Sequence, residues 1–111
     1  MSEPITTYRD FWPYYLREHA KPGTRAIHLL GTGLATLTLI ALVATGRVWL
    51  IPVALAAGYG PAWISHFFVE KNRPATFTYP LWSLISDYRM AIAWMTGRLS
   101  RDLARAGINA R

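Results

Sequence analysis

Two long runs of apolar residues fill the middle of the chain. Residues 26–45 form a run of twenty residues without a charged side chain, and residues 48–69 form a second run of twenty-two. At about 1.5 Å per residue, either run is long enough as a helix to cross a hydrocarbon layer of about 30 Å. Only Gly46 and Arg47 separate the two runs, which predicts a tight antiparallel helical hairpin that spans a membrane twice.

Helical patterns continue on both sides of this hairpin. Asp10 is a candidate N-cap for a short helix over residues 11–20, which the following Pro-Gly pair ends. Apolar residues recur at helical spacing over residues 81–97, but Asp87 and Arg89 lie in the middle of that segment. These charges favour an interfacial or packed helix over a third span. We therefore expect an all-α fold, with one membrane-embedded helical domain over the whole chain, residues 1–111.

The composition agrees with a membrane protein. Charged residues make up 16% of the chain and apolar residues 52%, against roughly 25% and 45–50% in soluble proteins. The absence of cysteine excludes disulfide bonds and thiolate metal sites. The alternative is a soluble core hairpin, but a chain of 111 residues has little other mass with which to bury two helices that are apolar on every face.

The charges lie at the two ends of the chain. The net charge is +6, and within residues 26–69 Arg47 is the one formal charge. The other eleven Lys and Arg residues lie beyond the outer ends of the apolar runs. The positive-inside rule therefore predicts that both termini are cytoplasmic. In the C-terminal tail, Arg98, Arg101 and Arg105 form one basic helical face. Membrane lipid is the expected partner of this basic tail, and nucleic acid is not, because no motif that reads nucleic acid accompanies the charge.

Three histidines lie where the predicted helices bring them together. His28 stands near the start of the first apolar run and His66 near the end of the second, so an antiparallel hairpin puts both at one depth. The turn before the first run folds His19 back towards them, and Glu70 follows His66 by four residues on the same helical face. Imidazole and carboxylate ligands suit Fe(II), Zn, Mn or Ni. The alternative is three unrelated histidines that form hydrogen bonds at a polar interface.

Other charged residues flank the same depth. Glu18 and Asp87 are carboxylates that can reach the cluster as hydrogen-bonding partners of the ligands. Arg25, Lys71 and Arg73 can attract the carboxylate of a substrate, and anchoring to anionic lipid explains these three residues equally well.

Two stretches resemble a known family. The sequences YYLREHAKPGTRAIHLLGT over residues 14–32 and WISHFFVEKNRPATFTYPLWSLISDYRM over residues 63–90 are similar to small membrane proteins long catalogued as a domain of unknown function. Fungal members of that family are 2-hydroxy fatty acid dioxygenases. The resemblance covers roughly residues 8–95, and its most specific part is the motif H-x3-E-K-x-R-P-A at residues 66–75.

The resemblance implies an Fe(II)-dependent enzyme of fatty acid α-oxidation, which uses dioxygen to shorten a 2-hydroxy fatty acid by one carbon at the cytoplasmic face of the membrane. The family's histidines match His19, His28 and His66, and its glutamate matches Glu70, which we accordingly expect to act in catalysis. Thr24 stands where the family pattern has asparagine, so we expect an altered hydrogen-bonding partner there. The short chain is of the bacterial type, which implies the inner membrane.

The chemistry of such a substrate agrees with these residues. A 2-hydroxy acid can chelate Fe(II) through its hydroxyl and one carboxylate oxygen and leave a neighbouring position for dioxygen. The alternative function is a non-catalytic membrane module, in which the histidines hold a structural Zn or lock the hairpin to the flanking helices. A structural zinc site is closed by four ligands, whereas a catalytic site keeps one position open.

Overall fold

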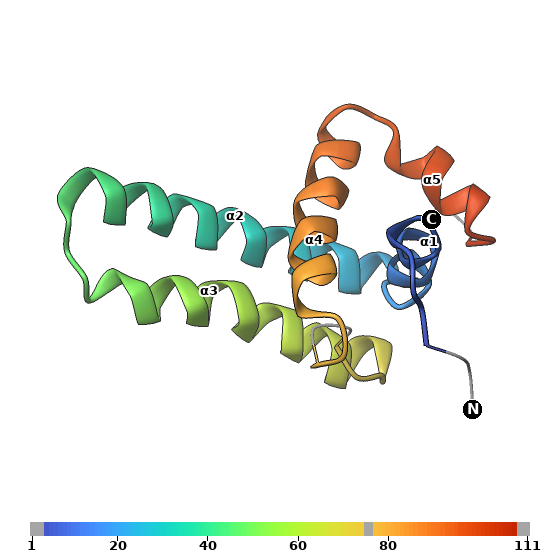
Figure 1. Ribbon diagram of the computed structural model, residues 1–111, viewed down its shortest axis with the longest axis horizontal. Helices are drawn as coiled ribbons and strands as arrows, with labels where there is room; N and C mark the ends of the chain where they lie inside the picture. The colour runs from blue at the N-terminus through green and yellow to red at the C-terminus, as the bar shows by residue number, and fades with distance from the viewer. Residues whose placement is uncertain (1–3, 75–76, 109–111) are drawn as a thin grey trace.

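The computed structural model describes residues 4–74 and 77–108, and within these residues the chain is helical and has no β-strand. The predicted all-α fold is confirmed. Figure 1 shows two long helices side by side as an antiparallel hairpin, a fourth helix that crosses them, and the first and last helices beyond the open end of the hairpin. In chain order the elements are α1 (Tyr8–Arg17), α2 (Pro22–Thr45), α3 (Leu50–Ile64), the π-helical turn η1 (Ser65–Glu70), α4 (Pro80–Met95) and α5 (Leu99–Arg105).

The first arm of the hairpin, α2, begins earlier than the predicted residues 26–45. Pro22 occupies the start of the helix, because proline fits a position whose N–H has no partner within the helix. Gly46 ends the helix in the left-handed conformation, with φ 67°, and its N–H donates to the Leu42 carbonyl at 2.7 Å. Among the described residues, α2 is the one helix long and apolar enough to cross a membrane.

The second arm corrects the prediction for residues 48–69. α3 has fifteen residues, about 22 Å at about 1.5 Å per residue, and then gives way to η1. The link between α2 and α3 consists of residues 46–49 rather than two residues. The second run is therefore not one regular helix, so a helical hairpin is present but two membrane spans are not confirmed.

The hairpin is unusually exposed. Only 11% of the most apolar 18-residue stretch of α2 is buried, and large apolar side chains are exposed along both arms. Four of the five threonine hydroxyls on α2 each donate to the carbonyl of their own helix four residues earlier; they belong to Thr32, Thr36, Thr38 and Thr45.

The packed core lies beyond the open end of the hairpin, between α1, α4 and α5. Its buried members are Phe11, Trp12, Tyr15, Leu16, Met90, Ala93, Leu99 and Leu103. α4 packs against both α1 and α2, as expected of a packed helix, and it spans residues 80–95 rather than 81–97 because Gly97 turns the chain with φ 76°. The basic tail therefore forms the separate helix α5.

The first helix also starts earlier than predicted. α1 spans Tyr8–Arg17 rather than residues 11–20. Thr7 is its N-cap and Asp10 is not, because the Thr7 hydroxyl oxygen accepts a hydrogen bond from the Asp10 N–H at 3.3 Å. The earlier end leaves His19 in the connection between α1 and α2.

Candidate metal centre

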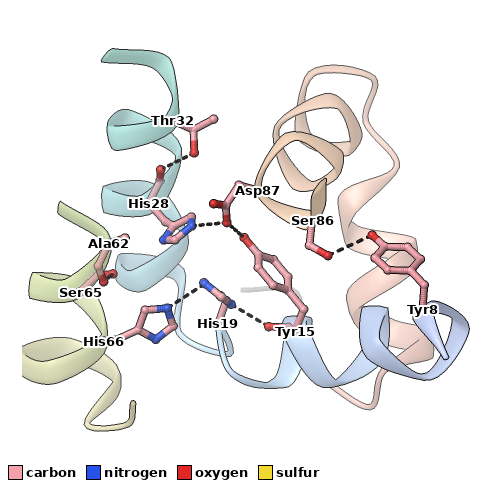
Figure 2. Close-up of polar contacts among 10 residues, drawn as sticks. All are labelled: Tyr8, Tyr15, His19, His28, Thr32, Ala62, Ser65, His66, Ser86 and Asp87. Carbon is pink, nitrogen blue, oxygen red and sulfur yellow. Dashed lines mark hydrogen bonds and ion pairs between the residues drawn. The ribbon is translucent and has the colours of Figure 1, made fainter. Parts of the chain in front are cut away.

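Three imidazoles converge where the loop after α1 meets both arms of the hairpin. One potential ligand atom from each of His19, His28 and His66 lies within 4.8 Å of the others, and all three side chains are buried. Their rings stand nearly perpendicular to one another, at 76–79°. Figure 2 shows the three rings arriving from three separate segments.

His19 is held by the helix that precedes it. Its Nδ1 lies 2.7 Å from the Tyr15 carbonyl oxygen, which can only accept, so Nδ1 carries the proton and Nε2 has a free lone pair. The Tyr15 ring also stacks on the His19 ring at a centroid distance of 4.1 Å. Burial, followed by the charges of His28 and His66, lowers the pKa of His19 well below its ordinary value. The ring is therefore neutral at pH 7, the form that binds metals.

His66 lies in the π-helical turn and is held by Asn72. The Asn72 side-chain oxygen accepts from Nδ1 of His66 at 2.7 Å, and its amide nitrogen donates to the Glu18 carbonyl at 3.1 Å. Lys71, in the left-handed conformation with φ 65°, reverses the chain so that Asn72 can return to His66. π-helical turns and non-glycine residues with positive φ both occur preferentially at functional sites.

The third imidazole of the group belongs to His28 on α2. Its Nε2 lies 2.6 Å from Oδ1 of Asp87, which reaches it from α4. With the carboxylate as acceptor, Nε2 is the donor, and in the neutral ring the lone pair belongs to the other nitrogen, Nδ1. Nδ1 is buried and has no hydrogen-bond partner among the described residues. A carboxylate that accepts from the outer nitrogen of a histidine is the usual support for a metal-binding imidazole.

These observations fit a metal ion. One nitrogen of each imidazole donates to its own acceptor, which leaves the other nitrogen of each neutral ring as a candidate metal ligand. Two of these nitrogens, Nε2 of His19 and Nε2 of His66, lie 2.9 Å apart with no proton to share, and the third is the unpartnered Nδ1 of His28. Three neutral imidazoles form a donor set that suits Fe, Zn, Cu and Ni.

The structure places Glu70 beside the N-terminus of α2 rather than among the convergent ligand atoms. Its Oε1 accepts from the Lys21 N–H at 2.9 Å and from the Thr24 hydroxyl at 2.8 Å. Because α2 has no side-chain cap of its own, Glu70 supplies the acceptor that the start of this helix lacks. Thr24 is thus a partner of Glu70. A ligand role for Glu70 stays a prediction.

The predicted substrate-binding cations lie outside the cluster. The Arg25 guanidinium is buried and donates to the carbonyls of His19 and Ala20 at 2.9 and 2.8 Å, so it holds the loop that carries His19. Lys71 is exposed, and the Arg73 guanidinium lies over the Phe77 ring. Burial and the charge of Glu70 raise the pKa of Glu18, whose backbone carbonyl contacts Asn72.

Two residues of the site were missed in the sequence. Tyr15 accepts from His19 through its carbonyl and donates its hydroxyl to Asp87 at 2.6 Å. Asn72 occupies the unspecified position of the motif H-x3-E-K-x-R-P-A. The signal available for both was their closeness in sequence to a histidine, at four and six residues.

An apolar cavity adjoins the centre. Its volume is about 270 Å³, and it lies between α2, α3 and α4. His28 and Asp87 form part of its wall, so the cavity connects directly with the candidate metal centre.

Comparison with known proteins gives a family for this arrangement. The family model described as "2-hydroxy-palmitic acid dioxygenase Mpo1-like" matches residues 5–99, a range that contains all three histidines, Asn72 and Asp87. No curated protein and no solved structure matches the chain.

Proposed function

The chain belongs to the Mpo1-like family, and from that premise we propose that it is an Fe(II)-dependent dioxygenase of 2-hydroxy fatty acids. It would act at the cytoplasmic face of a bacterial inner membrane and shorten its substrate by one carbon with dioxygen. The observation that carries the proposal is the group of three convergent, buried histidines, with an unpartnered Nδ1 on His28, beside an apolar cavity.

His19, His28 and His66 would hold the iron. Bound there, Fe(II) would supply a Lewis acid for the hydroxy and carboxylate oxygens of the substrate and the electrons for reaction with dioxygen. Three protein ligands leave coordination positions for both substrates, as catalytic metal sites require.

The chain's own residues keep the ligand lone pairs of the histidines available. Asp87 retains the proton of His28 on Nε2 and Asn72 retains that of His66 on Nδ1, so the other nitrogen of each ring keeps its lone pair. Burial, together with Asp87, raises the pKa of Tyr15 well above its ordinary value, so its hydroxyl remains a donor to Asp87. The packing of α1 and α4 around the cluster excludes bulk water from all three rings.

We propose that the hairpin of α2 and α3 lies in the bilayer with its tip on the far side and both termini in the cytoplasm. The length of α2 and the apolar side chains exposed along both arms support this placement. α3 is short for a full span, but η1 extends it at the level of His66. Because the chain has no cysteine, a Val48→Cys variant tests the topology: a membrane-impermeant thiol reagent should label it from the periplasmic side only.

The alternative is a structural zinc site in a non-catalytic module. Such a site needs a fourth protein ligand, and among the described residues no carboxylate or thiolate joins the three histidines in the convergent group. Three ligands beside a cavity favour the catalytic interpretation.

The deciding experiment combines metal analysis with an assay. Protein purified without oxygen should contain about one iron per chain and should consume dioxygen when a 2-hydroxy fatty acid is added. The His28→Ala, His66→Ala double variant should lose both the metal and the activity, whereas Arg98→Ala, on the remote basic tail, should lose neither. A single zinc that survives iron loading, without oxygen uptake, would favour the structural module.

A further inference from the structure

The cavity beside His28 has a polar end and an apolar end. His28 of the histidine cluster lines one end, together with Asp87, which contacts it, and Thr32, one turn further along α2. Towards the tip of the hairpin the wall is aliphatic, with Leu39 from α2 and Ile51 and Leu55 from α3. This polarity fits an amphiphile with one polar head and one hydrocarbon tail.

The cavity follows the long direction of the hairpin. On α2 its wall residues recur at helical spacing from His28 to Leu39, and on the antiparallel α3 they run from Ala62 back to Ile51. Eleven residues at about 1.5 Å each give a length of about 16 Å. With bonds of about 1.5 Å and near-tetrahedral angles, an extended alkyl chain advances about 1.3 Å per carbon, so this length accommodates roughly a dozen carbons.

Small side chains on α2 and α3 leave room for this cavity. Ala54 is buried, with 7% exposed, whereas its neighbours on the cavity wall, Ile51 and Leu55, are about half exposed. Ala54 therefore forms the floor of a groove, and the aliphatic residues form its open rim. Ala35 and Gly58 line the same groove nearer the histidines.

The groove is covered at the polar end and open at the other. α4 contributes Leu84, Asp87 and Tyr88 to its wall. The Thr36 hydroxyl donates its one proton to the Thr32 carbonyl at 2.8 Å, so Tyr88 must be the donor in its 2.7 Å contact with the Thr36 hydroxyl oxygen. Tyr88 thus links α4 to α2 two turns beyond His28, and the exposed aliphatic rim begins past it.

We infer that this groove binds the acyl chain of a free fatty acid, which enters sideways from the bilayer with its methyl end towards the hairpin tip, and that the small side chain of Ala54 keeps the groove open to long chains. The inference rests on the proposed function for the identity of the head group. A carboxylic acid head is small enough to approach the histidines, which are buried, whereas a phospholipid head group is not. The occupant is therefore a single-chain acid rather than a membrane phospholipid.

The position of Ala54 gives a quantitative expectation. Ala54 lies eight residues from Ala62, about 12 Å along α3 from the histidine end. A larger side chain there would block the groove after roughly nine carbons, at about 1.3 Å per carbon. Ala54→Phe should consequently exclude long chains and spare short ones. Ala56→Phe is the matched control, because Ala56 is exposed on the same helix and does not line the groove.

The first test is photocrosslinking, which requires no turnover. An analogue of a twelve-carbon fatty acid with a diazirine at its methyl end should label Leu39, Ile51 or Leu55 in the purified protein, and unlabelled 2-hydroxypalmitic acid should compete. Ala54→Phe should reduce this labelling at least about tenfold, as expected when a hydrophobic pocket loses several methylene contacts, while Ala56→Phe leaves it unchanged. Labelling on the outer faces of the helices, or labelling by a diazirine phospholipid that the free acid cannot displace, would overturn the inference.

The second test separates this inference from the proposed function. Ala54→Phe should lower the turnover of 2-hydroxypalmitic acid relative to a 2-hydroxy acid of about eight carbons at least about tenfold, with iron content unchanged. An equal loss at both chain lengths would show that position 54 does not control which chain lengths the groove accepts. Groove labelling without any oxygen uptake would refute the dioxygenase and leave the acyl site standing. If Ala54→Phe does not fold, Ala54→Leu and labelling of the unaltered protein decide the matter.

Discussion

The Tyr15 hydroxyl donates to the same Asp87 oxygen, Oδ1, that lies 2.6 Å from Nε2 of His28. Through its backbone carbonyl, Tyr15 also accepts from His19. One residue of α1 therefore orients two of the three imidazoles, one directly and one through a carboxylate on α4.

We expect Tyr15→Phe to weaken metal binding. The variant keeps the ring that stacks on His19 but removes the donor to Asp87, and loss of such supporting hydrogen bonds typically lowers metal affinity about 10- to 100-fold. Titration against a competing chelator measures the effect. Tyr14→Phe is the control, since Tyr14 packs against Phe11 and Tyr79 outside the cluster. Equal affinities in the two variants would contradict a role for the hydroxyl.

Asn72 should separate metal affinity from folding. Asn72→Ala removes the acceptor for Nδ1 of His66 and the donor to the Glu18 carbonyl, so we expect metal affinity to fall about 10- to 100-fold. Asn72→Asp keeps the acceptor and loses only the donor, and it should lower the melting temperature more than the metal affinity. Parental metal affinity in Asn72→Ala would show that His66 is oriented in another way.

Variants of Glu70 distinguish its role as a helix cap from a role as a metal ligand. As a cap, it needs an oxygen that accepts from Lys21 and Thr24, which glutamine retains. Glu70→Gln should keep its iron, and Glu70→Ala should lose about 0.5–2 kcal/mol of unfolding free energy, the usual effect of removing a cap. Metal analysis and thermal unfolding of both variants measure this. Loss of iron from Glu70→Gln with intact folding would instead support the ligand role predicted from the sequence.

The close contact of α2 with α3 gives a further prediction. A Cβ added at Gly31 would lie 3.1 Å from the Ala57 carbonyl oxygen and 3.1 Å from the Pro61 Cβ. Gly31→Val should therefore force the arms apart, cost about 1–3 kcal/mol of stability and lower the metal content, because His28 and His66 lie on opposite arms. Gly33→Val, where a Cβ meets nothing within 4 Å, should leave both properties unchanged.

The lengths of the two apolar runs and of the link between them were sufficient to predict that His28 and His66 lie close together. Their positions follow from two apolar runs joined by a short link, and each of these features is local in the sequence. The contribution of Asp87 was recognised only as a possibility, because it depends on how α4 crosses the hairpin, and His28 and Asp87 are 59 residues apart.

The role of Asn72 could not be predicted from periodicity. A regular α-helix through residues 48–69 carries no information about the π-helical turn, or about the left-handed Lys71 that turns Asn72 back to His66. The same local geometry explains Glu70. Its spacing of four from His66 placed it near the cluster, but the start of α2, with its unpaired N–H groups, competes for the carboxylate.

Four of the five threonines on α2 donate to the backbone of their own helix, and this affects how the helix enters a membrane. Judged by residue type, the helix carries several hydroxyls, but Thr32, Thr36, Thr38 and Thr45 each have a proton committed to a carbonyl of their own helix. Each hydroxyl proton therefore has its acceptor within the same segment, which lowers the cost of transfer from the translocation channel into lipid. With the hairpin placed in the bilayer as proposed, α2 would therefore enter lipid without waiting for α3, and the shorter arm would insert against it.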